Sequence, residues 1–108
     1  MMNRKRIPFE ASEMKKLIGL LEAAGIPFEY HDESIECDAI TFDMWHYHIY
    51  YPVMSIDTKI SVIQGYGSYG GSENLLEALV AGQGEPMGYM TAENAYEHIY
   101  AHWIGGDA

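Results

Sequence analysis

Basic residues are almost missing from this chain beyond its first sixteen positions. Five of the six Lys and Arg residues lie within residues 1–16, and Lys59 is the only one that follows. Residues 17–108 set this single lysine against fourteen carboxylates, which leaves a net charge of −13. Affinity for phosphate backbones and anionic lipids comes from Lys and Arg, so we expect no direct binding to nucleic acid or membrane. Such a surface attracts a basic protein, although acidity also keeps small proteins soluble.

Cysteine and long apolar runs are also scarce. Cys37 is the only cysteine, so an intramolecular disulfide is impossible, which suits a reducing cytoplasm. No apolar run approaches the roughly 18 residues that a membrane span needs. Pro8 and Glu10 follow the basic N-terminus where a signal peptide would have an apolar segment. We therefore expect a cytoplasmic protein.

The length and apolar content are those of one folded domain. The chain has 108 residues, of which 48% are hydrophobic, and a chain of this size can bury a core. We expect a single domain over residues 1–108, with a basic arm at 1–8 and a frayed tail at 104–108.

Apolar periodicity predicts an α+β fold in the order αβββαβα. Helices are expected over residues 9–24 and 92–103, and strands over 26–31, 44–51, 59–64 and 87–90. A further helix is expected to begin at Ser72, with an apolar stripe of Leu75, Leu76, Leu79 and Val80. Residues 35–43 fit either a short strand or an irregular loop. A mainly antiparallel sheet with helices packed on one face accommodates these elements.

A glycine-rich stretch follows the third predicted strand. Residues 65–70, GYGSYG, match the dinucleotide fingerprint G-x-G-x-x-G. That fingerprint also needs a parallel βαβ unit, whereas the strands around this stretch are short and predicted to be antiparallel. We therefore interpret the glycines first as a tight structural turn.

A small nucleotide-like ligand is the alternative interpretation of the same stretch. Backbone N–H groups near a helix start hold anions, and tyrosines stack on bases. The candidate contact residues for a ligand or partner are Tyr66, Gly67, Ser68, Tyr69, Gly70, Gly71 and Ser72.

Histidines provide the candidate metal ligands. His46 and His48 share one face of a predicted strand, and His98 and His102 share one face of a predicted helix. Further potential ligands are Cys37, Asp38 and Asp43. Whether these groups converge, or are merely exposed polar positions, stays open at this point.

Nucleophilic catalysis finds little support in the sequence. Ser68 is not in a G-x-S-x-G motif, and no basic residue neighbours Cys37 to lower its pKa. We predict no catalytic residue and no cofactor from these patterns.

Three runs carry a resemblance to a known group. They are LIGLLEAAGIPFE at 17–29, SVIQGYGSYGG at 61–71 and GYMTAENAY at 88–96. In these runs the chain resembles small proteins encoded in phages and prophages of Gram-positive bacteria, with residues 33–43 as an added or divergent segment. The resemblance implies a protein made in the bacterial cytoplasm, and small acidic phage proteins of this sort are often antagonists of host defence.

The leading functional prediction combines the resemblance with the charge. It is a non-enzymatic inhibitor of a bacterial defence system, of the anti-CRISPR type, that binds a basic nucleic-acid-handling protein. The predicted acidic surface consists of Glu29, Asp32, Glu33, Glu36, Asp38 and Asp43. The alternatives are a sponge for a nucleotide signal and a metal-dependent enzyme, and the chain could form homo-oligomers.

Overall fold

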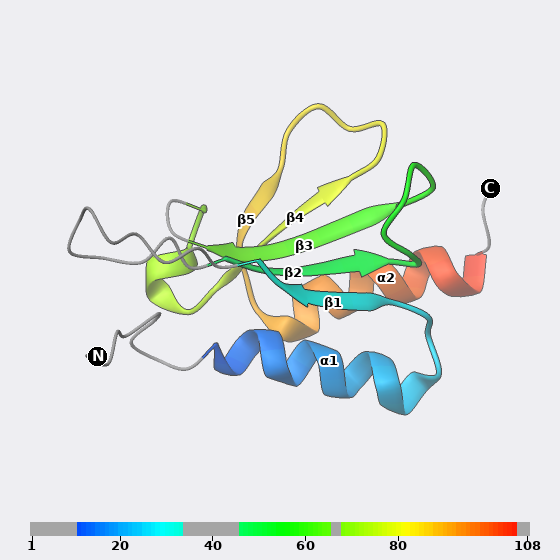
Figure 1. Cartoon of the computed structure of the whole chain (residues 1–108), viewed down its shortest axis with the longest axis horizontal. Helices are drawn as coiled ribbons and strands as arrows, with labels where there is room; N and C mark the ends of the chain where they lie inside the picture. Colours follow the sequence, from blue (N-terminus) through cyan, green and yellow to red (C-terminus); the bar gives the residue numbers. More distant parts are fainter. Residues whose placement is uncertain (1–10, 34–45, 66–67, 106–108) are drawn as a thin grey trace.

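The computed structural model of the chain describes residues 11–33, 46–65 and 68–105 (Figure 1). The elements of this part are, in chain order, α1 (Ser12–Ala24), β1 (Glu29–Asp32), β2 (His46–Tyr51), β3 (Ile60–Gly65), a short 3-10 turn (Gly71–Glu73), β4 (Leu76–Val80), β5 (Met87–Met90) and α2 (Ala92–Gly105).

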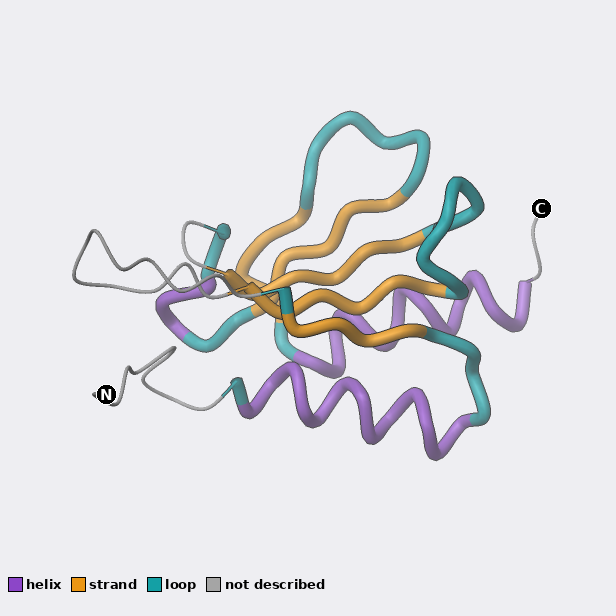
Figure 2. The backbone as a smooth tube through the Cα atoms, in the orientation of Figure 1, coloured by secondary structure: helices purple, strands orange, loops and turns teal. Residues whose placement is uncertain are grey.

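The described strands form one antiparallel sheet in the order β1-β2-β3-β4-β5. Each strand therefore pairs with its neighbour along the chain. Both helices lie on the same side of this sheet, as Figures 1 and 2 show. The α+β class, the antiparallel sheet and the helices on one face are confirmed. We call the side packed against α1 and α2 the core face and the opposite side the open face.

Strand alternation divides the residues between the two faces. On β2, Tyr47, Ile49 and Tyr51 are buried, while the alternating His46 and His48 are only partly buried. This is the division that the sequence predicts for the strand, because successive side chains point to opposite sides of a sheet. The core face continues on the next two strands with the buried residues Ile60, Val62, Leu76 and Ala78.

The helices cover the core face through apolar stripes. Met14, Leu17 and Leu21 of α1 are at most 1% exposed, and Ala95 and Ile99 of α2 are fully buried. These spacings of three and four residues place each set on one side of its helix.

Capping residues mark the end of α1 and the start of α2. Gly25 takes a left-handed φ of 71° and its N–H donates to carbonyl oxygens of the last turn of α1. At the start of α2, the Thr91 hydroxyl accepts from the Asn94 N–H, and Asn94 Oδ1 accepts from the Thr91 N–H. The predicted end of the first helix at residue 24 and the predicted start of the last helix at residue 92 are both confirmed.

The predicted helix beginning at Ser72 is wrong. Only one 3-10 turn forms, and Asn74 then takes a left-handed φ of 60°. Leu76 follows as the first residue of β4, which pairs with β3. Leu76 and Ala78 are buried whereas Leu79 is 45% exposed, a period of two rather than the helical stripe expected for the leucines. Pairing with β3 decides the outcome, because a short apolar run fits either element.

The remaining differences are small shifts of boundaries. β1 begins at Glu29 rather than Ile26, and α2 includes Ile104 and Gly105, which were expected in the tail. The predicted arm at residues 1–8 and the ambiguous segment 35–43 lie outside the described residues.

Candidate metal site on the open face of the sheet

The register of β1 and β2 brings acidic and histidine side chains together on the open face. His31 lies opposite His48, and Glu29 lies opposite Tyr50. The pairing continues one step past β1, where the Glu33 N–H donates to the carbonyl oxygen of His46 at 2.8 Å. Glu33 therefore shares the open face with His46 and His48, because alternate positions on one strand face the same way.

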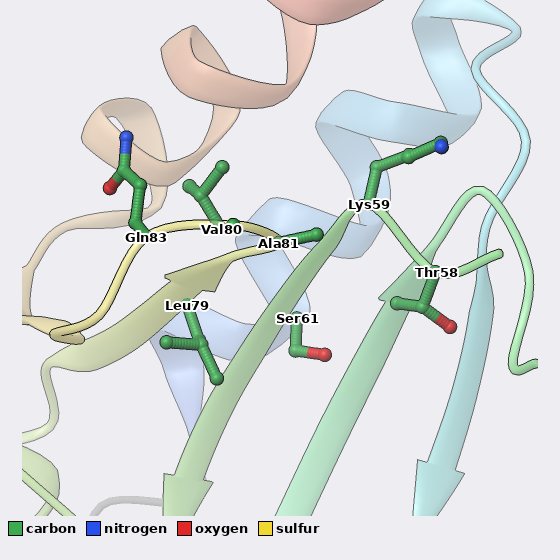
Figure 3. A pocket seen from close by; sticks show the side chains of 8 residues that line it. Thr58, Lys59, Ser61, Leu79, Val80, Ala81 and Gln83 are labelled. Atoms are coloured by element: carbon green, nitrogen blue, oxygen red, sulfur yellow. The ribbon is translucent and has the colours of Figure 1, made fainter. Parts of the chain in front are cut away.

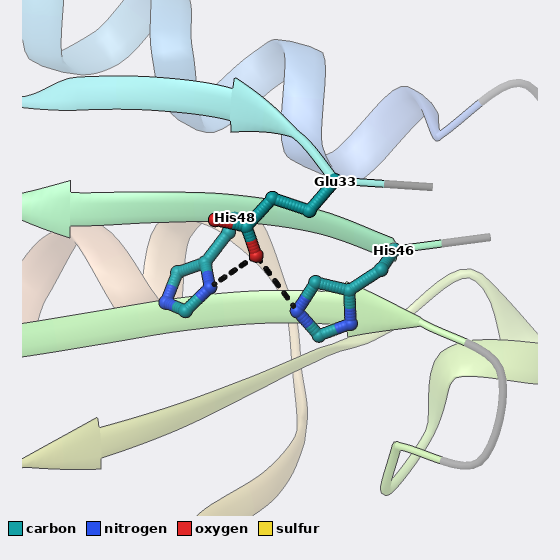
Figure 4. A group of neighbouring side chains, drawn as sticks. All are labelled: Glu33, His46 and His48. Atoms are coloured by element: carbon teal, nitrogen blue, oxygen red, sulfur yellow. Dashed lines mark hydrogen bonds and ion pairs between the residues drawn. The ribbon is translucent and has the colours of Figure 1, made fainter. Parts of the chain in front are cut away.

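Three side chains converge at this point, as Figure 4 shows. His48 Nδ1 donates to Glu33 Oε1 at 3.2 Å, and His46 Nε2 lies 3.6 Å from the same oxygen. All three potential ligand atoms lie within 4.8 Å of one another. The side chains of Glu33, His46 and His48 are 33%, 34% and 16% exposed. We call these three residues the Glu–His–His cluster.

Hydrogen bonds hold the carboxylate of Glu33 in its charged form. Burial opposes ionisation, but hydrogen bonds from Tyr50 and His48 outweigh it, and the pKa of Glu33 lies below its ordinary value. The hydroxyl of Tyr50 donates to Oε2, the other oxygen of this carboxylate. Burial and this bond to Glu33 raise the pKa of Tyr50 to about 12. Tyr50 is therefore a permanent donor at neutral pH.

His48 is held in its neutral form. Burial lowers its pKa below the ordinary value, although the bond to Glu33 acts in the opposite direction. Its ring stacks on Tyr50 with centroids 3.7 Å apart, and its Nε2 is buried without a hydrogen-bond partner among the described residues. A buried ring nitrogen without a partner costs about 1–3 kcal/mol. Packing alone would not favour a histidine at this position.

The cluster has the donor set of a transition-metal site, and both of its histidine-to-carboxylate distances suit one. Two imidazole nitrogens and one carboxylate oxygen are the ligands of many catalytic zinc and non-haem iron sites. With bonds of about 2.1 Å in tetrahedral geometry, neighbouring ligand atoms lie about 3.4 Å apart. The distances of 3.2 and 3.6 Å from Glu33 Oε1 bracket that spacing. An ion bound here would replace the proton that His48 Nδ1 shares with Glu33.

A pocket of about 350 Å³ adjoins the cluster on the open face. Its walls come from β2, β3, β4 and the loop between β4 and β5. The lining residues are His46, His48, Ser61, Ile63, Glu77, Leu79, Gly84 and Pro86. Three protein ligands leave coordination positions of a metal open, and a pocket beside them gives a small molecule access.

The other predicted histidine pair does not join this site. His102 Nδ1 lies 2.8 Å from the hydroxyl of Tyr51, a buried residue of the core face, and His98 is exposed on α2. The two pairs therefore lie on opposite sides of the sheet. Cys37, Asp38 and Asp43 lie outside the described residues.

The glycine-rich stretch has the contacts of a structural turn. The Ser68 hydroxyl accepts from the N–H of Gly65 and donates to its carbonyl oxygen, both at 2.9 Å. The N–H of Gly71, one of the expected anion donors, donates to Ser68 O at 3.1 Å. Ser72 lies in a turn of three residues rather than at a long helix start. Gly70 takes φ 88°, and Tyr66 and Gly67 lie outside the described residues.

Among the described residues of this stretch, Tyr69 contacts a residue that lines the pocket. The residue is 57% exposed, and its backbone N–H donates to Oε1 of the pocket residue Glu77 at 2.8 Å. Its carbonyl oxygen accepts from the N–H of Tyr89 at 3.3 Å. The nucleotide-binding role of the stretch stays a prediction.

The described residues of the predicted acidic surface do not form one group in the structure. Glu29 accepts from His31 Nε2 and from the N–H of Met54, both at 3.2 Å, and Glu33 belongs to the cluster. Asp32 lies on β1. The other three members, Glu36, Asp38 and Asp43, lie outside the described residues.

The sequence predicted the two histidines of the cluster as candidate metal ligands. It did not predict that Glu33 joins them or that Tyr50 contacts Glu33 and His48. Glu33 was assigned to a partner surface, and Tyr50 was not among the candidate site residues. The signal was present in the alternation of Glu29, His31 and Glu33 against that face. Pairing the first two predicted strands as a hairpin would have placed them together.

Comparison with protein families, with curated proteins and with solved structures gave no match. The resemblance to phage proteins and the anti-defence role therefore stay predictions. Neither described helix has the length and apolar character that crossing a membrane requires.

Proposed function

We propose that this protein binds a divalent transition-metal ion through Glu33, His46 and His48 and acts as a metal-dependent enzyme on a small molecule. The observation that carries the proposal is the convergence of three ligand atoms within 4.8 Å. The charged state of Glu33 and the neutral state of His48 support it, because metals bind deprotonated ligands.

The chemistry follows from the ligand count. An ion with two histidines and one carboxylate keeps a position for water, and such water ionises near neutral pH. The pocket of about 350 Å³ gives a substrate access to the open position. Hydrolysis or hydration of a small molecule is the reaction class that this arrangement supports best.

Titration of the metal-free protein with Co²⁺ tests the proposal. Cobalt replaces zinc in such sites, and its visible absorption reports the donor set. We expect saturable binding, weakened more than about 100-fold by His46→Ala or His48→Ala, since even loss of outer contacts costs 10–100-fold. His98→Ala removes an exposed histidine of α2 and is the matched control. Equal Co²⁺ affinity in all four proteins would overturn the proposal.

The inhibitor of a defence system is a second proposal, favoured by the charge of −13 over residues 17–108. Binding to a basic channel through exposed carboxylates would be fast and strongly weakened by salt. Pull-down of a purified RNA-guided nuclease at low and high salt measures this. Retention at low salt supports the inhibitor role, and no retention at low salt counts against it.

A further inference from the structure

The pocket beside the Glu–His–His cluster has histidines at one end, the carboxylate of Glu77 at the other, and Ile63 between them. His48 pairs with Ile63 of β3, and Ile63 pairs with Glu77 of β4, so these three lie in one row across the open face. Ile63 lies between the other two in this row, and the pocket is also lined by Leu79 of β4 and by Pro86 of the loop between β4 and β5. Strands are about 4.8 Å apart, so the row from His48 to Glu77 spans about 10 Å between Cα atoms.

Glu77 is fixed in place and keeps one oxygen available. Its Oε1 accepts the backbone N–H of Tyr69 at 2.8 Å, which anchors the carboxylate on the far side of the pocket from β2. Its Oε2 has no hydrogen-bond partner within the ranges 11–33, 46–65 and 68–105. A carboxylate beside an apolar wall binds most strongly to a group that is both charged and a donor.

No lysine or arginine is among the described residues that line this pocket. Lys59 lines a neighbouring pocket of about 230 Å³ that shares Ser61 and Leu79 with it. Figure 3 shows the Lys59 side chain directed away from those two shared residues. Among the described residues, none supplies a cation at the Glu77 end, and the carboxylate there repels phosphates and other carboxylates.

We infer that the pocket takes a small molecule with an apolar body and a protonated amine, whose ammonium group pairs with Glu77. The opposite end of the molecule reaches the open position of the metal at His46 and His48, so the inference rests on the proposed function. The apolar body lies against Ile63, Leu79 and Pro86. The substrate class is thus a small cationic amine rather than a nucleotide.

Three aryl hydroxamates of one size test the inference with Co²⁺-loaded protein. A hydroxamate chelates the metal, and the para substituent of the ring is aminomethyl, methyl or carboxyl. We expect the aminomethyl compound to bind about tenfold more tightly than the methyl compound, as a charge-assisted hydrogen bond permits. The carboxyl compound is expected to bind most weakly.

The variant Glu77→Gln separates charge from structure. The amide keeps an oxygen that can accept the Tyr69 N–H, so the fold and the Co²⁺ affinity should be retained. The preference for the aminomethyl over the methyl compound should fall below about threefold, the expected remainder after loss of the charge. Glu97→Gln, an exposed change on α2, should leave the tenfold preference unchanged.

The outcomes separate the two proposals. Co²⁺ and hydroxamate binding without an amine preference would overturn the assignment of the substrate class and leave the metal site standing. An amine preference that persists in Glu77→Gln would also overturn it. Failure of the wild-type protein to bind Co²⁺ at the cluster would overturn both.

Discussion

The hydroxyl of Tyr50 donates a hydrogen bond to Oε2 of Glu33, and the ring of the same tyrosine stacks on His48. One side chain of β2 thus orients two of the three candidate ligands. Outer contacts of this kind fix the direction of ligand lone pairs and are a regular feature of metal sites. Tyr50 is therefore a positioning residue in our account, and it does not itself contact the ion.

The variant Tyr50→Phe keeps the stacked ring and removes the hydroxyl. We expect the Co²⁺ affinity to fall by about 10–100-fold, the usual effect of losing an outer hydrogen bond. The visible spectrum at saturation should keep the shape of the wild type, because the donor atoms are unchanged. Tyr100→Phe, on the exposed side of α2, is the control and should bind as the wild type does. Wild-type affinity in Tyr50→Phe would contradict the positioning role.

Substitutions of two leucines distinguish the strand β4 from the helix that the sequence predicts for the same residues. Leu76→Ala should lower the free energy of unfolding by about 2–5 kcal/mol, because Leu76 is fully buried on the core face. Leu79→Ala should change it by about 0.5 kcal/mol or less, because Leu79 is 45% exposed on the open face. Urea denaturation measures both. Equal losses would favour a helix with both leucines in its stripe.

The close approach of Gly71 to the end of β3 predicts a second stability effect. A Cβ at this position would lie 2.5 Å from both Gly65 O and Ser68 Oγ. Gly71→Ala should therefore destabilise the fold by about 1–3 kcal/mol. Gly19→Ala is the matched change in α1, where a Cβ meets open space, and it should stabilise by about 0.5–1 kcal/mol. A harmless Gly71→Ala would contradict the packing of the glycine-rich stretch.

The ion pair between α1 and α2 predicts a dependence of stability on pH. Lys16 Nζ lies 3.1 Å from Glu93 Oε2, and both side chains are about half exposed. A backbone hydrogen bond at the start of α2, followed by the bond from Lys16, holds the pKa of Glu93 below its ordinary value. The pKa of Glu93 is lower in the folded protein than its unfolded value of about 4.5, so the ionised carboxylate stabilises the fold above that pH. This stabilisation is lost as the pH falls through the folded pKa.

The test compares wild type with Glu93→Gln across that range. The wild type should be slightly the more stable at pH 7, and the difference should shrink as both proteins are acidified below about pH 4. Glu97→Gln, one turn further along α2, controls for the general loss of negative charge. A difference that grows on acidification would have the wrong sign for this pair.

The sequence predicts those parts of the fold in which local pattern and tertiary pairing agree. The faces of β2, the stop at Gly25 and the cap at Thr91 follow from side-chain period and backbone preference. β4 was missed because Leu75, Leu76, Leu79 and Val80 also fit a helical stripe. This segment forms a strand because it pairs with β3 and because Asn74, just before it, takes a left-handed conformation.

Only the histidines of the site were predicted from the sequence, because the position of Glu33 depends on tertiary pairing. His46 and His48 are two apart on one strand, so the sequence alone places them on one face. Glu33 is thirteen residues before His46, and only the register of β1 against β2 brings it alongside. His98 and His102 looked equally promising, but the sheet separates them from the cluster. Which of two pairs gains a third ligand is a property of the tertiary structure.

The most direct test of the metal site is anomalous diffraction from crystals of the Co²⁺-loaded protein, measured at the cobalt absorption edge. Our account predicts an anomalous peak about 2.0–2.3 Å from ring nitrogens of His46 and His48 and from a carboxylate oxygen of Glu33. A peak at His98 or His102 with none at Glu33, or no peak at all in saturated crystals, would contradict it.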